Sequence, residues 1–441
     1  MVTGADKIRA SGRHDRRAQL MRSSSDILLV HPGKQHAYEV AAALRERGRL
    51  LQFVTGIYDT PDSSFVRLAH ASAAIVGRDT VERELSKRRH HAVDANHVTS
   101  WPLAELASRT IGRARVVQAL SGQRSGYAFV NWATDRSVAR ALRRGRWRPK
   151  AVYSFLGAAR HTFAACRELG IRTILDVPII LNAGETLSYE RRVLGLKAIR
   201  PAITDSHLRE EISVADHVVA PSRAVAQSLR AAHYTGGISE VPFGVDLETF
   251  RPSPHVGRAD PFRVIYAGRL ELRKGLHYLI RAWHEAAIPG ELVLAGPAGE
   301  AEYLRLLRRE YGATVREIGN LTRPELATAL ADSHVFVMPS LAEGSALVSY
   351  EALAAGLPAI VTHETGSVVR PGVDGFVVAA RDADAIAARL RELHGNATLR
   401  RQMALMARAR AEEFSWPAYR RRLLASIDAA ADASSVQSAI A

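Results

Sequence analysis

Two stretches of this 441-residue chain combine charge and glycine in a way that suits the binding of an anion. In the first stretch, Gly268 and Arg269 follow an apolar run, and Lys274 stands a few residues further on. Glycine lets a ligand approach the backbone closely, an arginine grips a phosphate with a forked pair of N–H groups, and a lysine acts as a compact point charge. The spacing indicates a phosphate site, with an ordinary basic loop as the alternative.

The second stretch places two carboxylates around the start of a predicted helix. This helix follows an apolar strand and is expected to run from Ser345 or Ala346 to Gly356. Unpaired backbone N–H groups at a helix start form a ready anion site. Glu343 precedes the helix and Glu351 lies within it, roughly 10 Å away at about 1.5 Å per residue. A diphosphate between a sugar and a ribose would fit this span. Alternatively, Glu343 only complements the helix dipole and Glu351 is a solvated helix residue.

Apolar strands alternate with helical patterns along most of the chain, which is typical of parallel α/β sheets. Residues 244–261 interrupt this alternation with proline and glycine, which indicates a linker between two series. Helical pattern continues through 382–412 until residues 414–417 interrupt it. The predicted strands are 27–30, 151–155, 173–177 and 217–220 in the first series, and 264–267, 292–295, 315–318, 335–338, 359–361 and 376–378 in the second.

The two series predict an α/β fold with two Rossmann-like, doubly wound domains that face each other across a cleft. In open parallel sheets, ligands bind beyond the carboxyl ends of the strands, so two such edges form a site for two substrates. We place the domains at residues 25–245 and 246–415, and expect the helix in 416–441 to pack back on the first domain and to fray at its end. Residues 1–24 are polar and basic, which indicates a disordered arm, and the sequence leaves open whether translation starts at Met1 or Met21.

The composition excludes several classes of protein. A hydrophobic fraction of 47% and a charged fraction of 24% are typical of globular domains. The single cysteine, Cys166, rules out an intrachain disulfide and a cysteine-rich zinc site. No apolar stretch is long enough to span a membrane, and the first 25 residues lack a secretory pattern, so we expect a cytoplasmic protein. The glycine motifs of nicotinamide dehydrogenases and P-loop nucleotidases are missing too.

The net charge of +15 is concentrated in two segments of the chain. Residues 1–24 hold six basic and two acidic side chains, and residues 78–150 hold sixteen and six. The densest runs are 87–91 and 143–150, and three tryptophans at 101, 132 and 147 lie among these charges. Such a positive field attracts nucleic acid, acidic lipid or phosphorylated substrates. A solvated arginine-rich surface, with the tryptophans in the core, is the alternative.

Taken together, these motifs resemble the retaining family 4 glycosyltransferases of the GT-B fold. The resemblance covers residues 205–420 well and 26–200 in outline. The matching residues are 268–270, 274–275, Gly319, 339–340, Glu343, 351–354, 356–358 and 374–375 in the second series, and 215–216, 221–222, 241–246, Phe250 and 414–416 outside it.

The resemblance implies an enzyme that moves a hexose-type sugar from a nucleotide-sugar donor to a saccharide or lipid-linked acceptor, in cell-surface polysaccharide or glycolipid synthesis. It assigns acceptor binding to the first domain and the donor to the second. Arg269 and Lys274 would hold the donor diphosphate and Glu343 the donor sugar, and these three are the predicted catalytic residues. Predicted substrate-binding residues are Gly33 and Gly268 for close approach of the donor, Asn320 and Leu321 for the base, Ser345, Ala346, Leu347 and Val348 for the phosphates, and Glu351 for the ribose.

The same resemblance implies no cofactor and no required metal, because cations and a helix N-terminus aimed at the departing diphosphate stabilise its charge. One departure concerns a histidine that the family usually has after a strand of the first domain. No histidine follows the strand at 173–177 here, so Asp176 takes its place or the alignment shifts by a few residues. His31 and His36 in the first loop are other candidates for substrate contact, although a loop histidine is more often a surface or structural residue.

The basic first domain favours an acceptor at a membrane. We expect it to dock on anionic lipid at the inner face, where each basic residue contributes about 1 kcal/mol and tryptophans insert. We expect no specific nucleic-acid partner. Three alternatives stay open: an inverting transferase or a nucleotide-sugar epimerase on the same fold, and a non-catalytic polyanion binder. The donor sugar and base, the acceptor, the linkage and the oligomeric state also stay open.

Overall fold

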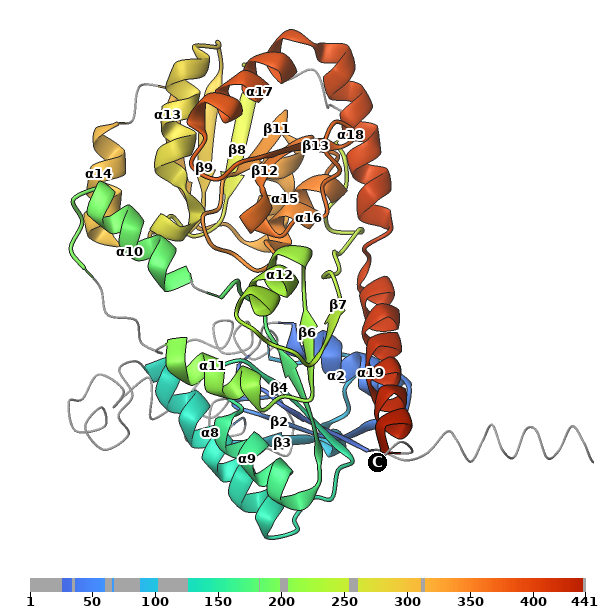
Figure 1. Ribbon diagram of the computed structural model, residues 1–441. Coiled ribbons are helices and arrows are strands. Elements are labelled where there is room, and N and C mark those ends of the chain that lie inside the picture. Colours follow the sequence, from blue (N-terminus) through green and yellow to red (C-terminus); the bar gives the residue numbers. More distant parts are fainter. Residues whose placement is uncertain are drawn as a thin grey trace, which may run out of the picture. The chain divides into compact units, whose positions relative to one another are not determined.

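The computed structural model describes residues 26–33, 36–59, 66, 88–101, 126–181, 183–198, 205–253, 261–310 and 314–438 (Figure 1). The predicted arm at 1–24 lies outside these residues, as do Lys87 and much of the basic segment 78–150. The described strands form two sheets, one of seven strands and one of six.

The first sheet has the strand order β3-β2-β1-β4-β5-β6-β7, and the pairs from β3 to β5 are parallel. Its order turns back on itself between β1 and β4, because the chain first builds outward from β1 on one side and then from β4 on the other. The strands are β1 (Ile27–Val30), β2 (Leu50–Thr55), β3 (Val98–Ser100), β4 (Ala151–Phe155), β5 (Arg172–Asp176), β6 (His217–Ala220) and β7 (Gly237–Glu240).

The second sheet repeats this plan with six parallel strands in the order β10-β9-β8-β11-β12-β13. This is the order of the doubly wound dinucleotide-binding fold, with the reversal between β8 and β11. The strands are β8 (Arg263–Ala267), β9 (Glu291–Ala295), β10 (Val315–Gly319), β11 (Val335–Met338), β12 (Ala359–Thr362) and β13 (Gly375–Val378).

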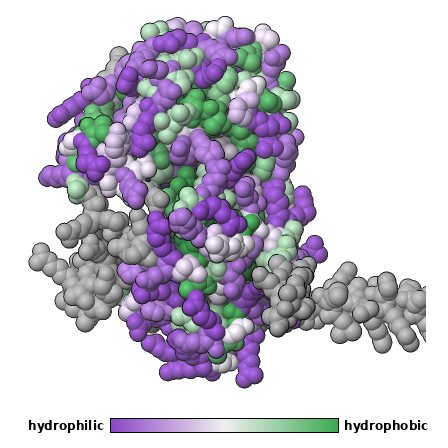
Figure 2. Space-filling view, in the orientation of Figure 1, coloured by the Kyte–Doolittle hydropathy of each residue, from purple (hydrophilic) through white to green (hydrophobic). Residues whose placement is uncertain are grey.

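Central strands of both sheets are continuous apolar runs because helices cover both faces of a parallel sheet. All four residues of β1 and of β11 have no exposed surface. Hydrophilic side chains dominate the visible face of the molecule in Figure 2. The helices are α2 (Ala37–Glu46), α8 (Gly126–Arg143), α9 (Arg160–Leu169), α10 (Ala183–Val193), α11 (Asp205–Ser213), α12 (Arg223–Ala231), α13 (Leu276–Ala286), α14 (Ala301–Arg309), α15 (Arg323–Ala331), α16 (Leu347–Ala354), α17 (Ala383–Gly395), α18 (Ala397–Glu412) and α19 (Trp416–Ser438).

Contacts divide the chain into two compact units that do not follow the sequence in a simple way. The first unit takes its described residues from Met1–Asp176, Ala202–Val218 and Leu423–Ala441. The second takes them from Val177–Pro201 and Val219–Arg422. Two segments that precede the second sheet in sequence therefore pack with it.

The predicted linker is partly a packed segment of the second unit. The Val245 N–H donates to the Phe414 carbonyl at 2.8 Å, and Phe250 is fully buried. Residues 254–260 of the predicted linker lie outside the described residues. The break between α18 and α19 falls at residues 413–415, close to the predicted interruption.

Candidate active site

The two anion-binding stretches of the sequence meet where the second sheet reverses its strand order. Gly268 follows β8 and Pro339 follows β11, and these two strands are neighbours. In doubly wound sheets this switch point leaves a crevice at the carboxyl ends of the strands, where ligands bind. The fold thus brings together two segments that lie about seventy residues apart in sequence.

Backbone contacts lock these two loops to each other. The Arg273 carbonyl accepts the N–H groups of Leu341 and Ala342 at 2.8 and 3.3 Å. Gly275 has a φ of +68°, and a Cβ there would lie 2.1 Å from the Pro339 carbonyl oxygen. Only glycine allows this approach, which holds the basic loop against the loop that carries Glu343.

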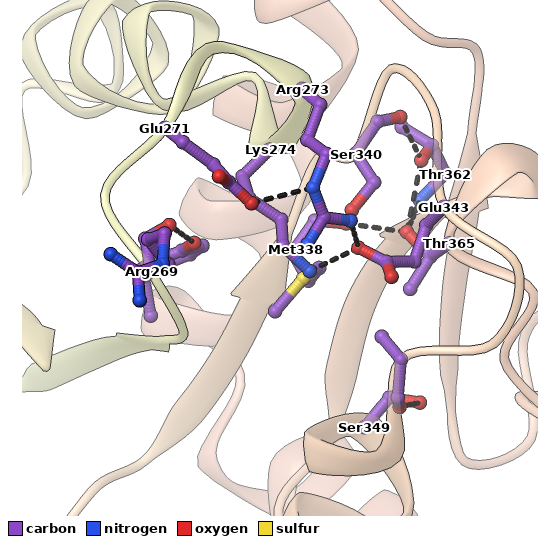
Figure 3. Close-up of polar contacts among 12 residues, drawn as sticks. Arg269, Glu271, Arg273, Lys274, Met338, Ser340, Glu343, Ser349, Thr362 and Thr365 are labelled. Atoms are coloured by element: carbon purple, nitrogen blue, oxygen red, sulfur yellow. Dashed lines mark hydrogen bonds and ion pairs between the residues drawn. The ribbon is translucent and has the colours of Figure 1, made fainter. Parts of the chain in front are cut away.

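A carboxylate between two cations forms the centre of the site (Figure 3). The Lys274 ammonium and the Arg273 guanidinium both donate to Oε2 of Glu343, and Arg273 also pairs with Glu271. The Lys274 side chain is only 8% exposed and that of Glu343 only 14%. Burial lowers the pKa of Lys274, and the Glu343 charge opposes this shift.

Arg273 is a member of this cluster that the sequence analysis did not select. It stands next to Lys274 in a short 3-10 turn, Leu272–Lys274, that follows β8. The turn directs two successive basic side chains to one carboxylate. The signal in the sequence was the pair of adjacent cations, but neighbouring residues usually point apart, so the pattern alone did not favour Arg273.

Arg269 lies apart from this cluster. Its side chain is exposed, and its guanidinium donates to the Ala298 carbonyl at 3.2 Å. Figure 3 shows its side chain away from the Lys274–Glu343 pair. Its predicted contact with the donor diphosphate therefore remains a prediction, as does the role of Gly268, which directly precedes it.

The N-terminus of α16 supplies backbone donors beside the Glu343 loop. The Ala346 N–H donates to the Thr365 carbonyl at 3.0 Å, and the Ser345 hydroxyl lies 2.9 Å from that of Tyr350. These two predicted phosphate contacts therefore have partners within the protein. Leu347 and Val348 lie in the first helical turn, where N–H groups lack intrahelical acceptors.

Two threonines hold the backbone that leads into this loop. The hydroxyl of Thr362 donates to the Ser340 carbonyl at 2.7 Å, and that of Thr365 donates to the Met338 carbonyl at 2.8 Å. Thr362 is the last residue of β12, the strand next to β11, and Thr365 lies three residues further on. Neighbouring strands thus fix the position from which Glu343 projects.

Glu351 is a buried carboxylate, so the alternative that it is a solvated helix residue is wrong. It is 5% exposed, and Arg323 donates to its Oε1 at 3.2 Å. Burial raises the pKa of Glu351 to about 7, and the Arg323 charge opposes this shift. Asn320 and Leu321, the predicted base contacts, lie between β10 and α15, just before Arg323.

The segment Val177–Pro201 supports the Glu343 loop from outside the second sheet. The Ile180 N–H donates to the Glu343 carbonyl at 3.1 Å, and the Ser222 hydroxyl donates to the Gly344 carbonyl at 2.5 Å. A Cβ on Gly344 would lie 1.7 Å from the Pro178 carbonyl oxygen. This contact explains a glycine after Glu343, and no periodic pattern in the sequence indicated it.

A buried carboxylate anchors the same segment further along. Glu190 on α10 accepts hydrogen bonds from His277 at 3.3 Å, from the Tyr278 hydroxyl at 3.1 Å and from Arg381. The next residue, Arg191, forms a two-fold ion pair with Glu300 at 2.7 Å. Because His277 follows Lys274 by only three residues, this contact attaches α10 to the chain next to the cationic loop.

The two histidine candidates of the first unit, His31 and His36, are largely buried and both contact Phe155. His31 is buried and stacks on Phe155, with 4.2 Å between ring centres. His36 Nε2 lies 2.9 Å from Oδ2 of Asp176. Gly33 lies in the loop between the two histidines, and its predicted contact with the donor remains a prediction.

Among the described residues, no group of three or more histidine, cysteine, aspartate or glutamate side chains could hold a metal ion. Asp382 and Asp384 form an Asp-x-Asp sequence, a pattern that can bind a metal ion, but both carboxylates have other contacts here. The Asp382 carboxylate caps α17 by accepting the Ala385 N–H at 2.8 Å, and Asp384 lies 3.7 Å from Arg281. No described helix is long and apolar enough to cross a membrane.

Two doubly wound sheets and a cationic site at the switch point of the second define a two-domain α/β protein of the nucleotide-binding kind. Residues 251–410 match the family model described as glycosyl transferases group 1. A glycogen synthase of Mycobacterium tuberculosis is 25% identical over 395 residues, which cover 87% of each chain. A D-inositol 3-phosphate glycosyltransferase of Mycobacterium avium is 32% identical over 241 residues, 49% of this chain and 56% of that enzyme.

Solved structures show the same fold. Anabaena HepE in complex with UDP and glucose superposes with a TM-score of 0.60 at 17% identity, over 91% of this chain and 99% of HepE. Sucrose-phosphate synthase from Thermosynechococcus elongatus superposes with a TM-score of 0.63 at 19% identity, over 92% of this chain and 99% of the synthase. Residues 251–410 thus carry a glycosyltransferase group 1 domain, as the resemblance predicted, and the chain has two Rossmann-like domains of the GT-B type, which confirms the predicted fold.

Replacing Gly344 with alanine tests the contact between the Glu343 loop and Pro178. The added Cβ must displace the Pro178 backbone, so we expect the free energy of unfolding to fall by about 1–3 kcal/mol. Urea unfolding measures this change. Gly395→Ala is the matched control, because a Cβ there meets nothing within 4 Å. Equal midpoints for the two variants would contradict the contact.

The burial of Glu351 predicts a dependence of stability on pH. Burial raises the pKa of Glu351 to about 7 in the folded chain, against 4.5 for an ordinary glutamate, so its contribution to stability is fully present below pH 4.5 and is lost as pH rises through 7. Between pH 5 and pH 8 the wild type should lose roughly 3 kcal/mol more than Glu351→Gln, at 1.36 kcal/mol per pH unit. Urea unfolding at both pH values measures this difference. Parallel losses would show that Glu351 is ionised throughout.

Proposed function

We propose that this glycosyltransferase retains the anomeric configuration and moves a sugar from a nucleotide diphosphate to a hydroxyl of a saccharide or lipid-linked acceptor. The observation that carries the proposal is the pair of cations, Arg273 and Lys274, held beside the N-terminus of α16 at the switch point of the second sheet. A site of this kind suits the diphosphate of a nucleotide sugar.

Charge separation explains why transfer needs these groups. As the bond from the anomeric carbon to the phosphate oxygen breaks, the sugar becomes positive and the diphosphate gains negative charge. Lys274, Arg273 and the N–H groups of Leu347 and Val348, which lack acceptors within α16, stabilise that negative charge from fixed positions. Because Lys274 is buried, its attraction for the departing diphosphate is screened less by water than that of an exposed lysine.

Glu343 takes two roles in this scheme. Without donor, its carboxylate neutralises both cations. The donor diphosphate replaces it on Lys274 and Arg273, and the freed carboxylate accepts hydroxyl hydrogens of the donor sugar. The acceptor oxygen then bonds to the anomeric carbon from the side of the leaving group, and its proton passes to the departing phosphate oxygen, which gives retention.

Names of related proteins support a hydroxyl-bearing acceptor. One relative is a glycogen synthase, another acts on D-inositol 3-phosphate, and the HepE structure holds UDP and glucose. We propose a UDP-hexose as donor, and a role in cell-surface polysaccharide or glycolipid synthesis. Exposed Arg143, Arg144, Arg146 and Arg148, beside the half-buried Trp147, support peripheral binding to anionic lipid.

Lys274→Ala tests the site assignment. Loss of one fixed charge at the departing diphosphate should lower kcat/KM for UDP release from UDP-glucose by about 10²–10³-fold. The thermal shift produced by UDP-, GDP- or ADP-glucose should shrink as well. Lys197→Ala removes an exposed lysine of the same unit and serves as the matched control. If Lys274→Ala keeps both the shift and the turnover of the control, the cationic site is not the donor site.

Metal independence follows from the same assignment. Since Arg273, Lys274 and the α16 N-terminus supply the positive charge, UDP release should continue in excess EDTA within about twofold of the untreated rate. Steady-state turnover with and without chelator measures this. Loss of activity in EDTA that Mg²⁺ or Mn²⁺ restores would mean that a metal carries the diphosphate charge.

A further inference from the structure

Glu190 on α10 is a charged side chain with no exposed surface. Its Oε2 accepts hydrogen bonds from the His277 ring at 3.3 Å and from the Tyr278 hydroxyl at 3.1 Å, and its Oε1 accepts one from Arg381. Burial disfavours the ionised form, but the hydrogen bonds from His277 and Arg381 hold the pKa of Glu190 below its ordinary value. A buried ion pair is weak evidence of stability, so this charge calls for another role.

Two of the donors to Glu190 stand directly behind the cationic turn Leu272–Lys274. His277 and Tyr278 are the second and third residues of α13, and one residue, Gly275, separates the turn from this helix. The Tyr278 N–H donates to the Gly275 carbonyl at 3.0 Å, and the Gly275 N–H donates to the first carbonyl of the turn at 3.0 Å. A displacement of Tyr278 therefore passes to the turn through two short backbone hydrogen bonds.

The side chains of His277 and Tyr278 have fixed roles at the carboxylate. The His277 N–H donates to the Tyr303 hydroxyl at 3.2 Å, and His277 Nδ1 lies 2.9 Å from the same oxygen, which leaves Nε2 to Glu190. Burial, with the Glu190 charge as the smaller cause, raises the pKa of Tyr278 to about 12, so at pH 7 its hydroxyl keeps the proton that it donates. The first turn of α13 thus presents two oriented donors to one carboxylate.

Arg381 holds the carboxylate from a third segment of the second unit. It lies three residues after β13 and has a φ of +70°, a strained conformation for a residue other than glycine that persists where neighbouring contacts hold it. Its guanidinium donates to Glu190 and lies 5.1 Å from the ring centre of Tyr189, the preceding residue of α10. α10 also contacts the turn Leu272–Lys274 directly. The helix is thus fixed between Arg381 and the cationic turn.

A purely structural anchor for α10 is the alternative, and the helix already has one. Arg191 pairs with Glu300 through two hydrogen bonds of 2.7 Å. Glu300 stands directly before α14, and among the described contacts this second ion pair fixes α10 without a bond to the first turn of α13. What distinguishes Glu190 from Arg191 is therefore its contact with the residues behind the cations.

We propose that Glu190 is a positioning residue for the cations of the site. It holds the first turn of α13 and, through it, keeps Arg273 and Lys274 in the orientation that faces the Glu343 carboxylate or a diphosphate. This inference rests on the proposed function for its effect on transfer, because it is there that a diphosphate meets these cations. Glu190 itself does not touch the donor.

Glu190→Gln tests this role, because it removes the charge at nearly the same volume. We expect kcat for UDP release from UDP-glucose to fall about tenfold at an unchanged KM, since misplaced cations act mainly on charge that develops as the bond breaks. Glu300→Gln is the matched control. It removes the charge from the other ion pair of α10 and should keep the wild-type kcat. Rates are measured well below the melting temperatures of both variants, so that a loss of folded protein does not enter.

Labelling of lysines gives a second readout that needs no donor. Reductive methylation with formaldehyde and cyanoborohydride modifies accessible amines, and mass spectrometry gives the rate at each lysine. The Lys274 side chain is 8% exposed in the wild type and should react about threefold faster or more in Glu190→Gln, because the turn opens more often. Exposed Lys150 is the internal reference and should react as before. A merely structural carboxylate would lower the melting temperature without this selective change at Lys274.

Tyr278→Phe keeps the test decisive if Glu190→Gln fails to fold. It deletes one donor to the carboxylate and keeps the ring, so kcat should fall about threefold and Lys274 should react faster. Tyr189→Phe removes a hydroxyl from an exposed ring of α10 and is the matched control. It should leave both readouts at their wild-type values.

The outcomes separate this inference from the proposed function. Wild-type kcat and Lys274 labelling in Glu190→Gln would overturn the positioning role and leave the donor site standing, and so would equal losses of kcat in Glu190→Gln and Glu300→Gln. A wild type that neither binds nor turns over a nucleotide sugar, with Lys274 selectively labelled in Glu190→Gln, would support the link from Glu190 to Lys274 and overturn the donor assignment.

Discussion

The candidate site depends on one electrostatic constraint: two cations and a carboxylate are in contact and have little exposed surface. Lys274 and Arg273 lie too close to each other to be buried without an anion, and Glu343 supplies it. Burying charge without a partner costs far more than burying a pair. An anionic ligand that displaces Glu343 would therefore meet cations that are already partly desolvated and oriented, which reduces what must be reorganised during a reaction.

Much of the fold could be predicted from the sequence because buried parallel strands are short and wholly apolar. The predicted strand at 335–338 is β11 to the residue, and those at 27–30, 151–155 and 217–220 are also confirmed. Helix ends were less accurate. The pattern at 382–412 was predicted as continuous, but Asn396 ends α17 and caps α18 by accepting the Leu399 N–H at 2.9 Å. The spacing of apolar residues does not reveal this cap. Asn396 alone ends one helix and begins the next, so the apolar pattern is not interrupted by a loop.

The site was predictable where chemistry and glycine coincide, and not where function depends on a partner distant in sequence. Lys274 and Glu343 were selected by type and spacing, and the structure pairs them. Arg323, which pairs with Glu351, and Ile180, which holds the Glu343 carbonyl, were missed. Both contacts link segments with no shared periodicity, so only the folded chain brings them together.

The assignment of Val177–Pro201 to the second unit has a consequence for dissecting this enzyme. A fragment cut at the apparent linker near residue 245 would contain the whole six-stranded sheet but would lack Pro178, Ile180 and Glu190. It would expose the Glu343 and Gly344 carbonyls and leave His277 and Arg381 without their shared carboxylate. A second unit that folds on its own would therefore need a rewired chain, in which the stretch around α10 is grafted ahead of β8 rather than discarded.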